Sequence, residues 1–333
     1  MIRFLLRRAL WFAVTLLAVV TVSFFLMRSV RGGPFSGERS LHPTIERNIE
    51  ARYHLDWPLW KQYLQYVGPL NLDGRGAAFL GGDSSRVLGG VLTGDLGPSF
   101  RYRDFTVNDI IAQSLPISLA LGSLALLWAI LLGVGTGLCA AIRRGGKLDL
   151  SLRLVATVGI ALPNFVIAGL LVLALVFGAG LFPVAGWGTP AHLVLPSLAL
   201  GAPFAAYISR LTRTGMLEVL SQDYIRTARA KGLPPHTVLL RHAIKGGILP
   251  VLSYLGPAIA GILTGSLVIE KFFAIPGTGT HFVNSALNRD YTLSMGVTIL
   301  YTVLVYSLNT LVDLAYTFLD PRIPLNGARV DGI

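Results

Sequence analysis

The chain has 333 residues, of which 53% are hydrophobic and only 14% are charged, and its mean hydropathy is +0.63. Soluble domains carry about 25% charged residues, so this composition all but excludes a soluble enzyme and indicates an integral membrane protein. The formal net charge of +11 is interpreted as a topology signal rather than a nucleic-acid signal. The single cysteine, Cys139, excludes an intramolecular disulfide, and we expect it to be a small buried thiol.

Uncharged stretches predict the membrane-spanning helices, because a bilayer takes about 20 predominantly apolar residues per helix. Five stretches qualify, and the third, 154–209, is too long for one helix. It contains two turns rich in glycine and proline, at 178–183 and 186–190. The sequence therefore predicts six transmembrane helices, at 9–30, 112–142, 150–177, 192–216, 247–269 and 291–317.

Basic residues predict the orientation. They gather before the first helix, between the second and third, and between the fourth and fifth. Under the positive-inside rule both termini are cytoplasmic. The first helix is expected to be an uncleaved span rather than a signal peptide. The resulting division is a cytoplasmic start with the first helix (1–31), an external segment (32–108), a five-helix core (109–320) and a cytoplasmic tail (321–333).

The external segment has two kinds of sequence. Residues 43–67 have an amphipathic helical pattern, whereas 68–98 are rich in Gly, Asp and Ser and predict open loop. Residues 105–114 predict a short interfacial helix, with Pro116 marking entry to the second span. A lid or a platform for a partner is one interpretation of this segment, and an inert loop is the other. For 68–93 we favour the inert loop.

The loop 217–246 carries strong helix-end signals. Ser221 is a good N-cap, Asp223 lies in the first turn, and Gly232 follows the last turn at C′. These residues predict a short helix at about 222–231. Pro235 predicts the first turn of a second helix that reaches residue 245, with 246–247 as the break before the fifth span.

Two interpretations of this short helix remain open from the residues alone. Stiff turns at both ends would make it a handle, because displacing it would move the two transmembrane helices that it connects. Alternatively, a basic amphipathic helix can rest on anionic lipid.

Motifs for covalent or nucleotide chemistry are missing from the sequence. The nearest approach to a phosphate-binding loop is 145–148, where Leu148 cannot ligate Mg²⁺. Metalloprotease and serine-hydrolase motifs are missing too, and the six histidines are scattered. Asp313 is placed at the cytoplasmic interface, so no midplane ionisable group argues for an ion-coupled carrier. Glycines at 133 and 137, and at 261 and 265, predict close helix packing.

The segment 225–232, followed by Arg241-His-Ala243 and Leu249-Pro250, resembles the EAA loop of binding-protein-dependent ABC importers. Arg226 and Thr227 stand where the general motif has Glu and Ala, as in the peptide branch. Stretch 70–92 is longer and richer in glycine than that branch leads us to expect. Further motifs resemble the B-type permease subunits of peptide importers: 33–39, 48–55, 94–100, 107–109, 275–279, 288–291 and 320–322.

The resemblance implies an all-α integral membrane protein with the type I ABC importer permease architecture, which forms half of a translocation pathway in the bacterial inner membrane. It implies a non-catalytic subunit without its own cofactor, with ATP and Mg²⁺ bound by two partner ATPase subunits. A second permease subunit, a periplasmic oligopeptide-binding protein, the lipid bilayer and a peptide substrate complete the expected partners; nucleic acid is not among them.

The resemblance also implies site residues. The loop that couples to the ATPase would use Asp223, Tyr224, Ile225, Arg226, Ala228, Arg229 and Gly232, and Tyr53 and Phe100 would belong to the periplasmic partner platform. Dipeptides, nickel chelates and glutathione are rival substrates within the family. A standalone secondary carrier or channel, or a membrane scaffold without transport, is the rival from another class.

Overall fold

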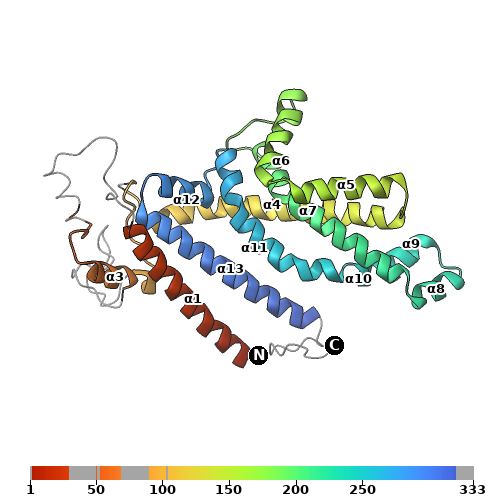
Figure 1. The fold of residues 1–333 in the computed structure, drawn as a ribbon, viewed down its shortest axis with the longest axis horizontal. Helices are drawn as coiled ribbons and strands as arrows, with labels where there is room; N and C mark the ends of the chain where they lie inside the picture. Colours follow the sequence, from red (N-terminus) through yellow and green to blue (C-terminus); the bar gives the residue numbers. More distant parts are fainter. Residues whose placement is uncertain (1, 30–49, 51–52, 69–89, 103, 320–333) are drawn as a thin grey trace. The chain divides into compact units, whose positions relative to one another are not determined.

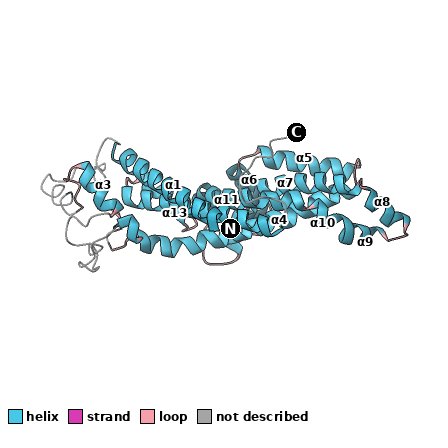
Figure 2. Ribbon diagram, turned by 90° about the horizontal axis from the view of Figure 1, so that it is seen from below, coloured by secondary structure: helices cyan, strands magenta, loops and turns pink. Residues whose placement is uncertain are grey.

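The computed structural model describes residues 2–29, 50, 53–68, 90–102 and 104–319. Within these ranges the regular secondary structure is helical (Figure 2). Extended residues pair at one isolated bridge, between Pro98 and Thr106. The chain divides into two compact units. The first comprises residues 1–117 and 276–306, and the second comprises residues 118–275 and 307–333.

The first unit contains α1 (Ile2–Ser29), α3 (Leu59–Val67), the short 3₁₀ helix η2 (Gly90–Thr93), the start of α4 (Val107–Ile142), α12 (Thr278–Leu287) and the first half of α13 (Tyr291–Leu319). Its core lies where α4 begins: Val107 and Ile110 are buried against Leu293 and Val297 of α13. Burial of these aliphatic side chains joins two segments that are almost 200 positions apart in sequence.

Besides the rest of α4 and the end of α13, the second unit contains the remaining helices (Figure 1). They are α5 (Lys147–Ala161), α6 (Asn164–Leu171), α7 (Ala191–Leu220), α8 (Asp223–Ala230), α9 (Pro235–Thr237), α10 (Ile244–Gly247) and α11 (Leu249–Phe272), with π-helical turns η3 (Val172–Gly178) and η4 (Val238–Ala243). The central helix is α7, which packs against α5, α6, α10 and α11.

Glycines allow α4 to pack closely on α7. A Cβ added at Gly133 would lie 2.7 Å from the carbonyl oxygen of Ala205, and one at Gly137 would overlap the carbonyl oxygen of Ser209. The backbones therefore approach more closely than any side chain would permit, which confirms the packing predicted for this glycine pair. For the second pair, Gly261 faces the ring of Phe204, and the surroundings of Gly265 lie outside the described part.

Four described helices are long and apolar enough to cross a membrane: Phe4–Ser29, Val107–Ile142, Ala191–Leu220 and Tyr291–Leu311. Two bent pairs also qualify, Lys147–Ala161 with Asn164–Gly178, and Pro235–Gly247 with Leu249–Leu263. Counting each pair as one span gives up to six, in line with the expected number. The chain is an all-α, multi-pass membrane protein.

The third predicted span, 150–177, is not one straight helix. It bends by 117° between α5 and α6, where Leu162 and Pro163 are extended, with ψ values of 134° and 145°. Proline disfavours the helical conformation in the residue before it, so Pro163 ends α5 and α6 starts in a new direction.

Three other predictions are corrected. The interfacial helix expected at 105–114 is the beginning of α4, which continues through Pro116 without a break. In the amphipathic stretch 43–67, the described residues show a turn at 53–56 and a helix that starts only after Pro58. Cys139 is exposed rather than buried.

Helix α12 was not predicted, because 278–287 mixes small and polar residues without a long apolar run. Several predictions lie outside the described residues. These are most of the loop 68–93, the start of the amphipathic stretch, the tail 321–333 and the side chain of Asp313.

Candidate functional site

The predicted short helix is present as α8, beyond the C-terminal end of α7 (Figure 1). Its exit is as expected: Gly232 has φ +78°, the left-handed conformation that favours glycine, and α9 begins at Pro235. Its entry differs. Gln222 occupies the N-cap position, and the hydroxyl of Ser221 donates instead to the carbonyl oxygen of Glu218, 2.7 Å away. Ser221 therefore closes the last turn of α7 rather than capping α8.

One face of α8 packs against its own chain. Ile225 and Ala228 are buried in a cluster with Met216 of α7 and Val238 of η4. The other residues expected to couple to a partner lie on the opposite, exposed face or at the helix end: Asp223, Tyr224, Arg226, Arg229 and Gly232. The predicted site therefore has two parts. Its apolar residues attach α8 to the unit, and its polar residues face outward.

The attachment continues into a close crossing of two backbones. A Cβ at Gly215 of α7 would overlap the carbonyl oxygen of Gly247, and a Cβ at Gly247 would overlap the sulfur of Met216. The helical break lies after Gly247, at Ile248, rather than at the glycines themselves, and the chain bends there by 49°. The two glycines thus hold the end of α7 against the start of the next span.

A buried ion pair fixes the other side of α7. The guanidinium of Arg213 donates from Nε to Oδ1 and from Nη2 to Oδ2 of Asp149, at 2.7 and 2.9 Å. The amide of Gly145 donates to the same carboxylate at 2.9 Å. The side chain of Asp149 is only 1% exposed. No pattern in the sequence predicted this pair, although Asp149 is the only carboxylate between Asp109 and Glu218.

In the first unit, a buried carboxylate ties two family-like motifs together. Asp290 accepts hydrogen bonds from the hydroxyl of Ser99, from the amide of Phe100 at 3.2 Å and from the hydroxyl of Thr292 at 3.1 Å. The Thr292 hydroxyl is also 2.6 Å from the carbonyl oxygen of Pro98. These hydrogen bonds fix the motif 94–100 to the start of α13. Nothing in the spacing of these residues along the sequence predicted the contact.

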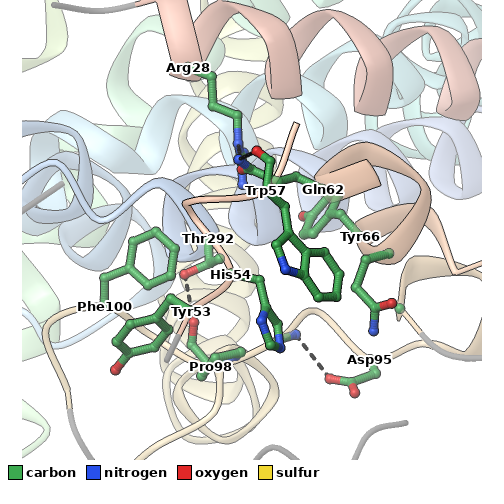
Figure 3. A pocket seen from close by; sticks show the side chains of 13 residues that line it. Arg28, Tyr53, His54, Trp57, Gln62, Tyr66, Asp95, Pro98, Phe100 and Thr292 are labelled. Carbon is green, nitrogen blue, oxygen red and sulfur yellow. Dashed lines mark hydrogen bonds between the residues drawn. The ribbon is translucent and has the colours of Figure 1, made fainter. Parts of the chain in front are cut away.

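The two residues expected in the platform are in contact. The rings of Tyr53 and Phe100 meet edge-on, with centroids 5.0 Å apart. Phe100 is buried, and Tyr53 is partly exposed beside a small pocket that both residues help to line (Figure 3). Tyr53 is thus the more accessible of the two rings, and the buried ring of Phe100 packs against it. Their role in docking stays a prediction.

Two family models match the sequence over almost its whole length. Residues 107–324 match the binding-protein-dependent transport system inner membrane component, and residues 1–122 match the N-terminal part of such membrane components. The chain belongs to this family.

Full-length relatives agree. The permease is 44% identical over 325 residues to the oligopeptide transport system permease protein OppB of Escherichia coli (strain K12). The alignment covers 97% of this chain and 99% of the relative. It is 43% identical over 326 residues to the dipeptide transport system permease protein DppB of Bacillus subtilis (strain 168), covering 98% and 99%.

The fold has a counterpart among solved structures. The permease superposes on a chain of the MetNI methionine ABC transporter in inward-facing conformations with a TM-score of 0.55, at 15% identity. The match covers 63% of this chain and 96% of that one. Together with the sequence relatives, it assigns the permease the architecture of ABC transporter membrane subunits.

Proposed function

We propose that this permease is a transmembrane subunit of an ATP-driven, binding-protein-dependent importer of peptides, and that it forms half of the translocation pathway. Its relatives are named as permease proteins of oligopeptide and dipeptide transport systems. The two identities, 44% and 43%, differ too little to favour one peptide length. Nickel chelates and glutathione remain rival cargoes.

The main support for this proposal is the way in which α8 packs on the rest of the chain with one face only. Ile225 and Ala228 attach it to the ends of α7 and η4, while its polar face is left exposed. A free helix of eight residues is unstable in water, so this attachment explains how α8 stays helical before a partner binds. A force on the exposed face would pass through the Gly215–Gly247 crossing into two spans.

The proposed function also requires several partners. The sequence has no phosphate-binding loop, so we assign ATP and Mg²⁺ to two cytoplasmic ATPase subunits and no cofactor to this chain. A second permease subunit would supply the other half of the pathway, and a periplasmic peptide-binding protein would deliver the cargo. The permease would lie in the bacterial inner membrane with both termini in the cytoplasm.

Reconstitution tests this function. The permease is placed in liposomes with the second permease subunit, the ATPase subunits and the binding protein, and ATP-dependent uptake of a labelled pentapeptide is measured. We expect uptake that requires every component. Dipeptide, glutathione and nickel-chelate competitors identify the cargo. Uptake by this chain alone, driven by an ion gradient, or saturable ATP binding to the isolated chain, would refute the proposal.

A further inference from the structure

A pocket in the first unit gathers side chains from five segments, one of which is the turn before α3. Arg28 comes from the end of α1, Gln62 and Tyr66 from α3, Asp95 from the loop before α4, and Thr292 from α13 (Figure 3). Its volume is about 130 Å³. Because one water molecule needs roughly 10–15 Å³ by the same measure, the pocket has room for a small organic group.

The guanidinium of Arg28 is held in place by its neighbours, but not all of its hydrogen-bond donors have an acceptor. Its Nε donates to Oε1 of Gln62 at 2.8 Å, and its plane lies over the ring of Phe24, 3.8 Å from the centroid. Gln62 is itself fixed, because its Nε2 donates to the carbonyl oxygens of Leu55 and Trp57 at 3.1 and 2.7 Å. Nη1 of Arg28 is buried and has no hydrogen-bond partner among the described residues.

A second unused donor lies beside it. The hydroxyl of Tyr66 is buried and likewise lacks a partner in the described part of the chain. Tyr66 follows Gln62 by one helical turn, so both point from the same face of α3, and Tyr66 is near enough to Arg28 for the two groups to interact electrostatically. Burial raises the pKa of Tyr66 above its usual range, so its hydroxyl keeps the proton that it would donate.

Arg28 and Tyr66 line the same pocket, and each has one buried donor atom without an acceptor among the described residues. Buried polar atoms are nearly always hydrogen-bonded, and leaving a charged donor unpaired costs more than leaving a neutral one. Asp95 lines the same pocket, but its Oδ1 accepts from the amide of Gly97 at 2.9 Å. Its negative charge would disfavour a dianion such as phosphate. The group that matches a guanidinium and a hydroxyl is a carboxylate.

The aromatic walls of the pocket would pack against the hydrocarbon part of a molecule that carries a carboxylate. His54 and Trp57 stack with ring centroids 4.2 Å apart, and Tyr53 and Phe100 meet at the pocket's edge. We propose that this pocket binds a single carboxylate, held by Nη1 of Arg28 and the hydroxyl of Tyr66. The carboxylate comes either from the free C-terminus of a peptide or from an acidic side chain of a protein that docks on this unit.

Acetate is the first probe, with acetamide as its uncharged match. The full-length permease in detergent is titrated with each at constant ionic strength, and Trp57 fluorescence is followed; Trp57→Phe assigns the signal. We expect saturable quenching by acetate and none by acetamide. Tyr66→Phe should weaken acetate binding about two- to tenfold, the effect of one hydrogen bond. Tyr63→Phe is the matched control, because its hydroxyl pairs with Thr21 at 2.7 Å, and it should leave acetate binding unchanged.

Equal responses to acetate and acetamide, or an unaltered affinity in Tyr66→Phe, would overturn the site and leave water as its occupant. A further pair of titrations distinguishes the sources. Competition by a short peptide but not by its C-terminal amide identifies a peptide terminus. If instead neither peptide competes and acetate weakens docking of the binding protein on the assembled complex, the source is a side chain of that protein. The acetate titration needs no transport partner, so its failure would leave the proposed function untouched.

Discussion

Arg213 and Asp149 form a two-pronged ion pair that holds α7 against the first turn of α5. A buried carboxylate that loses its partner keeps its desolvation cost without the compensating attraction. Arg213→Met should therefore lower the melting temperature of the purified chain by several degrees. Asp149→Asn in the same background should recover most of that loss, because it removes the stranded charge.

Arg210→Met serves as the control, since Arg210 lies one turn earlier on α7 with an exposed side chain. It should change the melting temperature little. Equal losses in the two single variants would mean that the ion pair has no special role in fixing α7.

Cysteine labelling should distinguish the two faces of α8. Thr227 is exposed and Ala228 is buried, so in a Cys139→Ala background Thr227→Cys should react with a maleimide and Ala228→Cys should react slowly. If an ATPase partner docks on α8 as proposed, we expect it to crosslink to a cysteine at residue 227 and not to one at residue 228. In the assembled complex, we expect protection of the cysteine at 227. Undiminished labelling there would favour a helix that rests on lipid.

Ile225 should be essential for the attachment of α8. Its side chain is fully buried, and truncation of a buried isoleucine to alanine costs about 2–5 kcal/mol. Ile225→Ala should loosen α8, so that hydrogen exchange of residues 223–230 rises and ATP hydrolysis no longer drives uptake. Thr227→Ala, on the outer face of the same helix, should not raise exchange. A normal exchange rate in Ile225→Ala would refute this attachment.

Gly232 tests the exit from α8. No neighbouring atom lies within 4 Å of an added Cβ, so only the positive φ penalises a side chain. A residue with a Cβ pays about 1–2 kcal/mol in this conformation. Gly232→Val should allow membrane insertion but reduce the number of peptides imported per ATP. Gly232→Asn should stay close to wild type because asparagine tolerates left-handed backbone. Equal effects of the two substitutions would point to lost space rather than strain.

The pH dependence of stability should include His281. Its Nδ1 has no partner among the described residues, and burial lowers the pKa of His281 from its ordinary value of 6.5. The unfolded chain therefore binds this proton more readily than the folded chain. The contribution of His281 to the stability of the folded chain is fully present above about pH 6.5 and is lost as the pH falls toward the lower pKa of the folded state. His281→Gln should flatten the melting temperature between pH 7 and 5, whereas His236→Gln, at an exposed position, should not.

Local signals in the sequence determined the class of the protein, the approximate positions of its spans and the C-terminal end of the short helix. An uncharged run long enough to cross a bilayer is unfavourable in water and therefore predicts a membrane span. Gly232 and Pro235 predict helix boundaries because each constrains the backbone at its own position. The apolar composition likewise predicted a membrane protein without any knowledge of its partners.

Tertiary structure decided the features that depend on distant residues. Pro163 was visible in the sequence, but the 117° bend at this position depends on what α6 packs against. The pairing of Asp149 with Arg213 joins positions 64 apart, and the contact of Ser99 with Asp290 joins positions 191 apart. Which face of α8 is buried was decided by the same long-range packing, because Ile225 and Ala228 meet Val238 only after the chain reverses at Gly232. Periodicity and capping act within one or two turns of a helix, and partners across the fold are selected by packing and burial.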